Sequence, residues 1–215
     1  DLISAVSSGI TQDEYDKLSQ IAPTLAQSAD YIDFGTPWQE TTLRIGAAVG
    51  KSAEAEVLVS RVDGLFADAR TRNPQFEGKN IVVAYNYGES RTYGYYTAQD
   101  TRARFFTDLG FVIPAELLEI AGDSFYADIS TERIDLFDQD VLVFLGLQWA
   151  EGGRDAIEND PLISQLDAVR DGRVVFIPAE YDDALQYGTV LSLEYALEGI
   201  LPELEAALPE PDAGA

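Results

Sequence analysis

The sequence predicts an α/β fold in which a mostly parallel sheet is flanked by helices. Short, strongly apolar runs have the length and composition of buried strands, and they lie at residues 80–85, 140–146 and 173–177. Stretches with helical periodicity alternate with these runs and lie near residues 98–109, 131–137, 154–168 and 188–207. Strand–helix alternation at this spacing is typical of a parallel sheet with helices on both faces.

The start of the chain predicts smaller elements. Residues 1–6 are apolar enough for a buried strand. Thr11 and Glu14 have the spacing of a capping box, which predicts a helix that runs to about Ile21 and is ended by Pro23. Residues 24–35 then contain a short extended stretch.

A long helix is predicted next, from Pro37 to about Arg72, with a break near Gly50. Thr36 is expected to cap this helix, Pro37 suits its first turn, and Gln39 can complete a capping box. After the break, the apolar side chains fall on one stripe, at Leu58, Val62, Leu65, Phe66 and Ala69.

The composition favours binding over catalysis. The net charge of −24 argues against partners that carry phosphate, such as nucleic acid or an anionic membrane surface. The chain contains no histidine and no cysteine, so neither a Ser-His-Asp nor a Cys-His arrangement can be built, and the commonest zinc ligands are missing. We therefore expect no catalytic residues, no metal site and no cofactor.

Aromatic residues follow the predicted strands, at the strand ends where ligands bind in open α/β sheets. A tyrosine-rich segment with one arginine follows the strand at 80–85, a tryptophan follows the strand at 140–146, and two tyrosines follow the strand at 173–177. We expect these side chains to line one concave surface and to bind a ligand: Tyr87, Arg91, Tyr93, Tyr95, Trp149, Tyr181 and Tyr187.

An ordered set of short motifs covers nearly the whole chain. It includes LSQIAPT at 18–24, DLGF at 108–111, ISTE at 129–132, DVLV at 140–143 and LDAV at 166–169. In order and spacing, these motifs resemble the substrate-binding proteins of ABC importers for iron–siderophore complexes, a group that also includes cobalamin and haem binders.

This resemblance implies two α/β lobes joined by one long helix, with the ligand between the lobes. It assigns residues 1–35 to a remnant of the N-terminal lobe, 36–73 to the interlobe helix, 78–209 to the C-terminal lobe and 210–215 to a tail. Most of the N-terminal lobe, a signal sequence and a lipid-carrying cysteine are expected upstream. The resemblance also implies an extracytoplasmic, monomeric protein that captures a ferric siderophore and delivers it to the permease subunits.

Glu132, in the ISTE motif, matches a surface acidic residue that docks on the permease in proteins of this kind. A second explanation of Glu132 requires no partner protein: a glutamate in the first turn of a helix interacts favourably with the helix dipole. Three other functions stay open on the sequence alone: haem or cobamide binding by the same fold, an α/β enzyme for nucleotides or sugars, and a protein-interaction module that uses the tyrosines. The few cations favour a neutral or weakly charged chelate, such as a hydroxamate.

Overall fold

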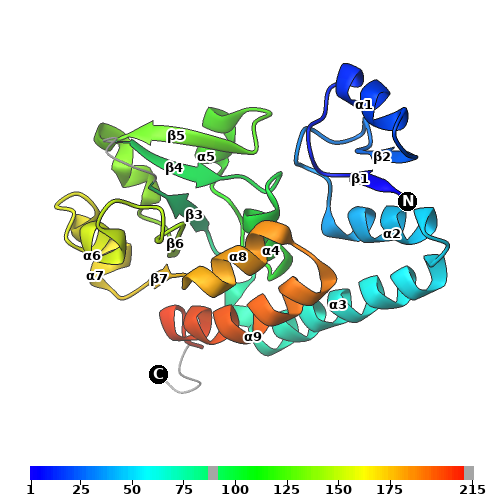
Figure 1. Cartoon of the computed structure of the whole chain (residues 1–215). Coiled ribbons are helices and arrows are strands. Elements are labelled where there is room, and N and C mark those ends of the chain that lie inside the picture. Colours follow the sequence, from blue (N-terminus) through cyan, green and yellow to red (C-terminus); the bar gives the residue numbers. More distant parts are fainter. Residues whose placement is uncertain (87–91, 211–215) are drawn as a thin grey trace.

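The chain forms two sheets joined by a pair of helices, as a computed structural model of residues 1–86 and 92–210 shows (Figure 1). The smaller sheet consists of two parallel strands, β1 (Ile3–Ala5) and β2 (Thr24–Ala26). The larger sheet has the strand order β5-β4-β3-β6-β7. Its strands are β3 (Ile81–Tyr85), β4 (Thr92–Tyr96), β5 (Tyr126–Ser130), β6 (Val141–Leu145) and β7 (Val174–Phe176). The α/β fold predicted from the sequence is therefore confirmed.

The larger sheet is mostly parallel, as predicted, because β4 is the one antiparallel strand among those that the structure describes in it. β3, β6 and β7 are parallel to one another, whereas β4 is antiparallel to both β3 and β5. The tyrosine-rich segment was expected to be a loop up to Tyr96, but its second half forms β4. The side chains of residues 92–96 point alternately to the two faces of the sheet, as in any strand. Three of these residues are buried tyrosines.

Helices cover the larger sheet, and several of them differ from the predicted ones. The segment at 154–168 forms three short pieces, because turns at Asn159 and Leu166 interrupt it. The segment at 131–137 is a 3-10 helix, and α5 and α8 were not predicted. The elements are η1 (Pro74–Phe76), α4 (Thr101–Asp108), α5 (Ala115–Ala121), η2 (Thr131–Phe137), α6 (Gly153–Glu158), η3 (Ile163–Gln165), α7 (Asp167–Arg170), α8 (Ala179–Tyr187) and α9 (Val190–Ala207).

The predicted capping box on the first helix is confirmed, whereas the predicted cap on the second is wrong. In α1 (Gln12–Ser19), the Thr11 hydroxyl accepts the Glu14 N–H, and the Glu14 carboxylate accepts the Thr11 N–H at 2.8 Å. The next helix, α2 (Trp38–Ala48), has Pro37 at its N-cap. The hydroxyl of Thr36 instead donates to the carbonyl of Val6 at 3.1 Å, which ties the segment before α2 to the strand β1.

The long helical region breaks where the sequence predicted. α2 ends at Ala48, and α3 (Ser52–Arg72) begins after Gly50, whose φ of +73° favours glycine. At this elbow, Gly46 faces the methyl group of Ala55 so closely that a side chain at 46 would overlap it. The apolar stripe of α3 then packs on the C-terminal sheet domain, where Phe66 meets Phe105 edge to face at 5.4 Å.

One arginine joins the N-terminal residues to the larger domain. Arg104 on α4 donates through Nη2 to the carbonyls of Gly35, at 3.0 Å, and of Gln99, at 3.1 Å. Asp108 lies one turn further along α4, facing Arg104, the indole of Trp38 and the guanidinium of Arg70. Burial raises the pKa of Asp108 to about 6, although Arg104 and its other neighbours favour the charged form.

Two helical glycines, Gly46 at the elbow and Gly64 within α3, should respond oppositely to substitution by alanine in their free energy of unfolding. Gly46→Ala should lower the free energy of unfolding by about 1–3 kcal/mol, because the new methyl group overlaps Ala55. Gly64→Ala in α3 should raise it by about 0.5–1 kcal/mol, because nothing lies within 4 Å of the added carbon and alanine favours the helix. Urea denaturation measures both. Equal effects of the two substitutions would contradict the packing at the elbow.

Asp108 predicts a pH-dependent contribution to stability. Its pKa is higher in the folded chain than the value of about 3.9 expected in an unfolded one. The folded protein thus binds the extra proton, and the stability gained from Asp108 is present at low pH and is lost as pH rises through about 6. Between pH 5 and 7, the wild-type protein should therefore lose stability relative to Asp108→Asn. Asp68→Asn, at an exposed carboxylate of α3, is the control, and parallel curves for wild type and Asp108→Asn would refute the expectation.

Candidate functional site

The turn after β6 carries the most exposed of the predicted ligand-binding residues. Trp149 has 68% of its surface exposed, and its backbone N–H donates to the carbonyl of Gly146 at 2.9 Å. The N–H of Gly146 in turn donates to the carboxylate of Asp182 on α8 at 3.1 Å. This turn therefore presents an indole ring at the carboxyl end of β6. Tyr87 and Arg91, which were predicted to lie near it, fall outside the described residues.

Tyr93 and Tyr95 belong to the core of the larger domain. Both are buried in β4, where the Tyr93 hydroxyl donates to Asp160 at 2.7 Å and the Tyr95 hydroxyl donates to the carbonyl of Leu117 at 2.7 Å. Burial raises the pKa of Tyr95 to about 12, and burial together with Asp160 raises the pKa of Tyr93 even further. The expectation that these two rings line an exposed surface is corrected, because strand alternation turns them into the core.

Tyr181 and Tyr187 are both on α8, and neither lies at the end of β7. The Tyr181 ring packs against Tyr195 of α9, with 5.1 Å between ring centroids, and covers Gly199. Tyr187, 76% exposed, lines a groove of about 500 Å³ that α2 and α3 close on the other side. The structure thus places Tyr181 and Tyr187 on α8 and Trp149 after β6, and a shared rim for these three residues stays a prediction.

A pocket of about 300 Å³ lies where the N-terminal residues meet the larger domain. It is lined by Phe34, Asp100, Thr101, Arg102, Phe125 and Gln186. The rings of Phe34 and Phe125 meet edge to face with centroids 6.0 Å apart. Phe34 is about half exposed and has a φ of +63°, a conformation that costs a non-glycine residue on the order of 1 kcal/mol and that is enriched at functional sites. We call this site the interdomain pocket.

The charged side chains of the interdomain pocket are paired with each other. Arg102 donates to both carboxylate oxygens of Asp100, at 2.8 and 2.7 Å, and the same carboxylate caps α4 by accepting the Arg102 N–H at 2.8 Å. The guanidinium also lies 3.7 Å from the centroid of the Tyr96 ring. A bidentate ion pair over an aromatic face fixes the guanidinium in one plane.

Two tyrosine rings extend the pocket across the sheet. Tyr96 packs against Tyr85, with 4.6 Å between ring centroids. The Tyr85 ring crosses β4 directly above Gly94, where any side chain would overlap it, and its hydroxyl donates to the exposed Asp128 of β5 at 3.3 Å. The result is a shelf of aromatic rings with a carboxylate at its far end.

A buried carboxylate connects the interdomain pocket to the turn that holds Trp149. Asp182 is 6% exposed and accepts hydrogen bonds from Gly146 N–H and from the Gln148 amide, the latter at 2.8 Å. Burial raises its pKa, while these hydrogen bonds and the nearby Arg102 oppose the rise. Asp182 therefore positions the residues after β6 relative to α4 and α8.

Sequence reasoning missed Phe34, Asp100, Arg102 and Phe125. Asp100 carried a usable signal, since an aspartate directly before a helical stretch is a common N-cap. The other three carried none, because Phe34 and Phe125 lie in loops and the position of Arg102 over the Tyr96 ring brings two separate elements together.

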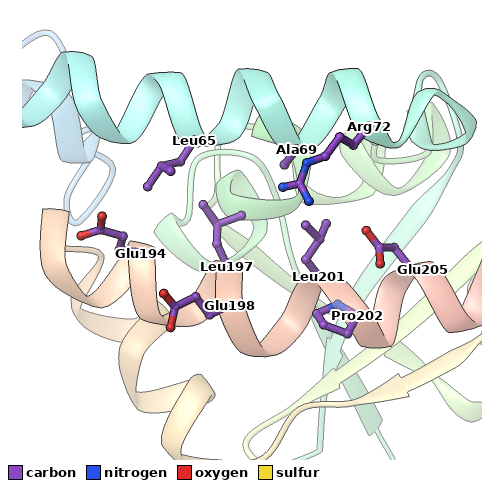
Figure 2. Close-up of a pocket in the computed structure, with 9 residues that line it drawn as sticks. All are labelled: Leu65, Ala69, Arg72, Glu194, Leu197, Glu198, Leu201, Pro202 and Glu205. Atoms are coloured by element: carbon purple, nitrogen blue, oxygen red, sulfur yellow. The ribbon is translucent and has the colours of Figure 1, made fainter.

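A second groove lies between α3 and α9, as Figure 2 shows. It has a volume of about 340 Å³, an apolar floor formed by Leu65, Ala69, Leu197 and Leu201, and three glutamates along α9. Arg72 reaches into it from α3 (Figure 2). None of the predicted ligand-binding residues is among those that line this groove, and it lies between helices instead of at strand ends.

In residues 1–86 and 92–210, no cluster of three or more acidic, histidine or cysteine side chains could hold a metal ion. Over the same ranges, no helix has both the length and the apolar character needed to cross a membrane.

Comparisons with known proteins identify relatives of this chain. It is 25% identical over 178 residues to the ferric-anguibactin-binding protein FatB of Vibrio anguillarum, covering 78% of this chain and 53% of FatB. It is 23% identical over 194 residues to the ferric enterobactin-binding periplasmic protein FepB of Escherichia coli, covering 83% of this chain and 56% of FepB. The chain thus spans about half the length of these relatives.

Solved structures show the same arrangement of elements. PiaA of Streptococcus pneumoniae, solved in complex with ferrichrome, matches with a TM-score of 0.80 and 30% identity, over 97% of this chain and 70% of PiaA. FhuD2 of Staphylococcus aureus, solved with ferrioxamine B, shares the fold with a TM-score of 0.73 at 14% identity, over 97% of this chain and 77% of FhuD2. The family model for periplasmic binding proteins matches residues 1–181, and the chain therefore belongs to the periplasmic binding protein family.

Proposed function

We propose that the chain acts in an extracytoplasmic protein that captures a ferric siderophore and delivers it, without chemical turnover, to an ABC importer. The observation that carries the proposal is the similarity to PiaA, solved with ferrichrome, at 30% identity and over nearly the whole chain. The names of FatB and FepB, both ferric-siderophore binders, agree with it. In this proposal the protein is a monomer, and residues 1–35 and 78–209 belong to two lobes that residues 36–73 connect.

We place the ligand over the interdomain pocket and the strand ends beside it. Phe34, Phe125 and Trp149 offer exposed or half-exposed rings, which suit a bulky chelate with apolar edges. Tyr87 and Arg91 are proposed to complete the site, with Arg91 donating to oxygens of the chelate. The protein supplies no iron ligand in this scheme, because the siderophore fills the coordination sphere of the metal.

Trp149 supplies a direct test, because the two tryptophans differ in environment. Trp38 is 3% exposed and Trp149 is 68% exposed. Ferrichrome should quench the fluorescence of the full-length protein, and Trp149→Ala should remove most of that quenching. The substitution should also weaken binding about tenfold or more, as expected when an aromatic anchor is lost.

The matched control is Tyr187→Ala, which removes an equally exposed ring from the groove beside α2. This variant should bind ferrichrome like the wild type. If Tyr187→Ala weakens binding and Trp149→Ala does not, the ligand lies beside α2 and the proposed site is wrong. Hydrolysis of a substrate by a protein that binds no siderophore would favour an enzyme.

Glu132 is proposed to dock on the permease. It is exposed in the first turn of η2, immediately after β5 ends at Ser130, whereas its neighbour Arg133 is paired with Glu116 at 2.5 Å. An exposed carboxylate on the rim of a surface can pair with a partner's arginine, and such rim charges govern association more than stability.

Glu132→Ala should therefore reduce uptake through the cognate importer and leave ligand affinity unchanged. Its effect on the free energy of unfolding should stay within about 0.5 kcal/mol, as is usual at the surface. Asp135→Asn removes a charge from another exposed position of the same short helix and should not affect uptake. A loss of ligand affinity in Glu132→Ala, with transport intact at saturating ligand, would exclude the docking role.

A further inference from the structure

The interdomain pocket has an electrostatic character that bears on which chelates it accepts. From its charge distribution, and on the basis of the proposed function, we infer that the site selects ferric siderophores without net negative charge and discriminates against anionic triscatecholates. The relatives do not decide this point, since PiaA was solved with ferrichrome whereas FepB is named for ferric enterobactin.

The cation of the pocket is already neutralised. Arg102 donates two short hydrogen bonds to Asp100, and the side chains of this pair are only 15% and 7% exposed. The guanidinium is also held over the Tyr96 ring at 3.7 Å. The Asp100 carboxylate, which in addition caps α4, thus neutralises the charge that an anionic ligand would otherwise meet. Arg102 therefore serves to order the pocket and does not attract an anion.

Two further arginines, Arg104 and Arg154, also have interaction partners of their own. Arg104 donates to the carbonyls of Gly35, Ala98 and Gln99, at 3.0–3.2 Å, and so points into the joint between the domains. Arg154 pairs with Glu158 at 2.7 Å and lies over the Phe176 ring at 4.5 Å. Neither Arg104 nor Arg154 is among the described residues that line the pocket, and the Nη1 atom of Arg104 is buried without a hydrogen-bond partner.

Carboxylates outnumber cations around the same surface. Asp182 faces Arg102 from α8 and holds its two hydrogen bonds to the turn after β6. Asp128 is exposed at the end of the aromatic shelf, with the Tyr85 hydroxyl as its donor. The Asp100 carboxylate forms an ion pair with Arg102. Among the described residues that line the pocket or its aromatic shelf, Arg102 is thus the one cation, beside Asp100, Asp128 and Asp182. At physiological salt such local charges dominate because screening acts over about 8 Å.

The chemistry of the two ligand classes follows from charge balance. Three singly charged hydroxamates neutralise Fe³⁺, so ferrichrome brings no net charge to the site. Three doubly charged catecholates exceed the charge of Fe³⁺, so ferric enterobactin brings a net negative charge. Placing that charge beside Asp128 and Asp182 is unfavourable, and like charges brought together at a binding site are a common means of rejecting a wrong partner.

The test compares ferrichrome with ferric enterobactin, using the full-length protein and fluorescence quenching at low and physiological salt. Ferrichrome should bind at least about tenfold more tightly, a ratio that one repulsive charge contact can produce. Its affinity should change little with salt. The affinity for ferric enterobactin should rise with salt, because screening weakens the repulsion.

Asp128→Asn provides the decisive variant, because the amide oxygen can still accept from Tyr85 while the charge is removed. It should raise the affinity for ferric enterobactin several-fold relative to the affinity for ferrichrome, because only the ferric enterobactin complex carries a net negative charge. Asp68→Asn, on the exposed side of α3, changes the net charge equally and should alter neither affinity.

Equal or tighter binding of ferric enterobactin by the wild type, or an Asp128→Asn effect matched by Asp68→Asn, would overturn the charge selection and leave siderophore capture intact. Failure of both chelates to bind wild type and variants would instead refute the proposed function, and the selection with it.

Discussion

The position of the candidate site depends on the hydrogen bonds of Arg104. This guanidinium connects the carbonyl of Gly35, at the end of the N-terminal residues, to the loop that precedes α4. Phe34 is the residue before Gly35, and Phe125 lies across the joint on the larger domain, so the hydrogen bond of Arg104 to Gly35 helps to position the two rings against each other. Asp108 provides the counter-charge from the next turn of α4. Burying a charge is tolerated here because carbonyls and a carboxylate surround it.

The site itself is built by side chains that satisfy one another. Asp100 orients Arg102, Arg102 covers Tyr96, Tyr96 packs on Tyr85, and Tyr85 reaches Asp128. A surface ordered in this way loses little conformational entropy when a ligand binds to it. Such a surface presents ring faces together with one exposed carboxylate, Asp128.

The fold was predictable from the sequence to a larger extent than the site. Apolar runs identified β3, β6 and β7, and the Thr11–Glu14 pair and Gly50 marked where helices begin and break, because these signals are local. β4 was missed because strand pairing with β3 and β5 decides its conformation. The prediction of the site failed for the same reason: its contacts join residues that are distant in sequence. Tyr93 and Tyr95 turn inward through strand alternation, and Phe34 gains its role from a contact with Phe125, which is distant in sequence.

Two glycines in this structure lie directly beneath tyrosine rings, Gly94 under Tyr85 and Gly199 under Tyr181. In each case the ring occupies the volume that any side chain at the glycine would need. The two positions of a pair are therefore not free to vary independently in evolution. A homologue that carries a larger residue at position 94 must have lost or reoriented the ring at position 85, and the same holds for 199 and 181. An alignment of relatives would display each pair as correlated columns, and so record the aromatic shelf in sequences whose structures are unknown.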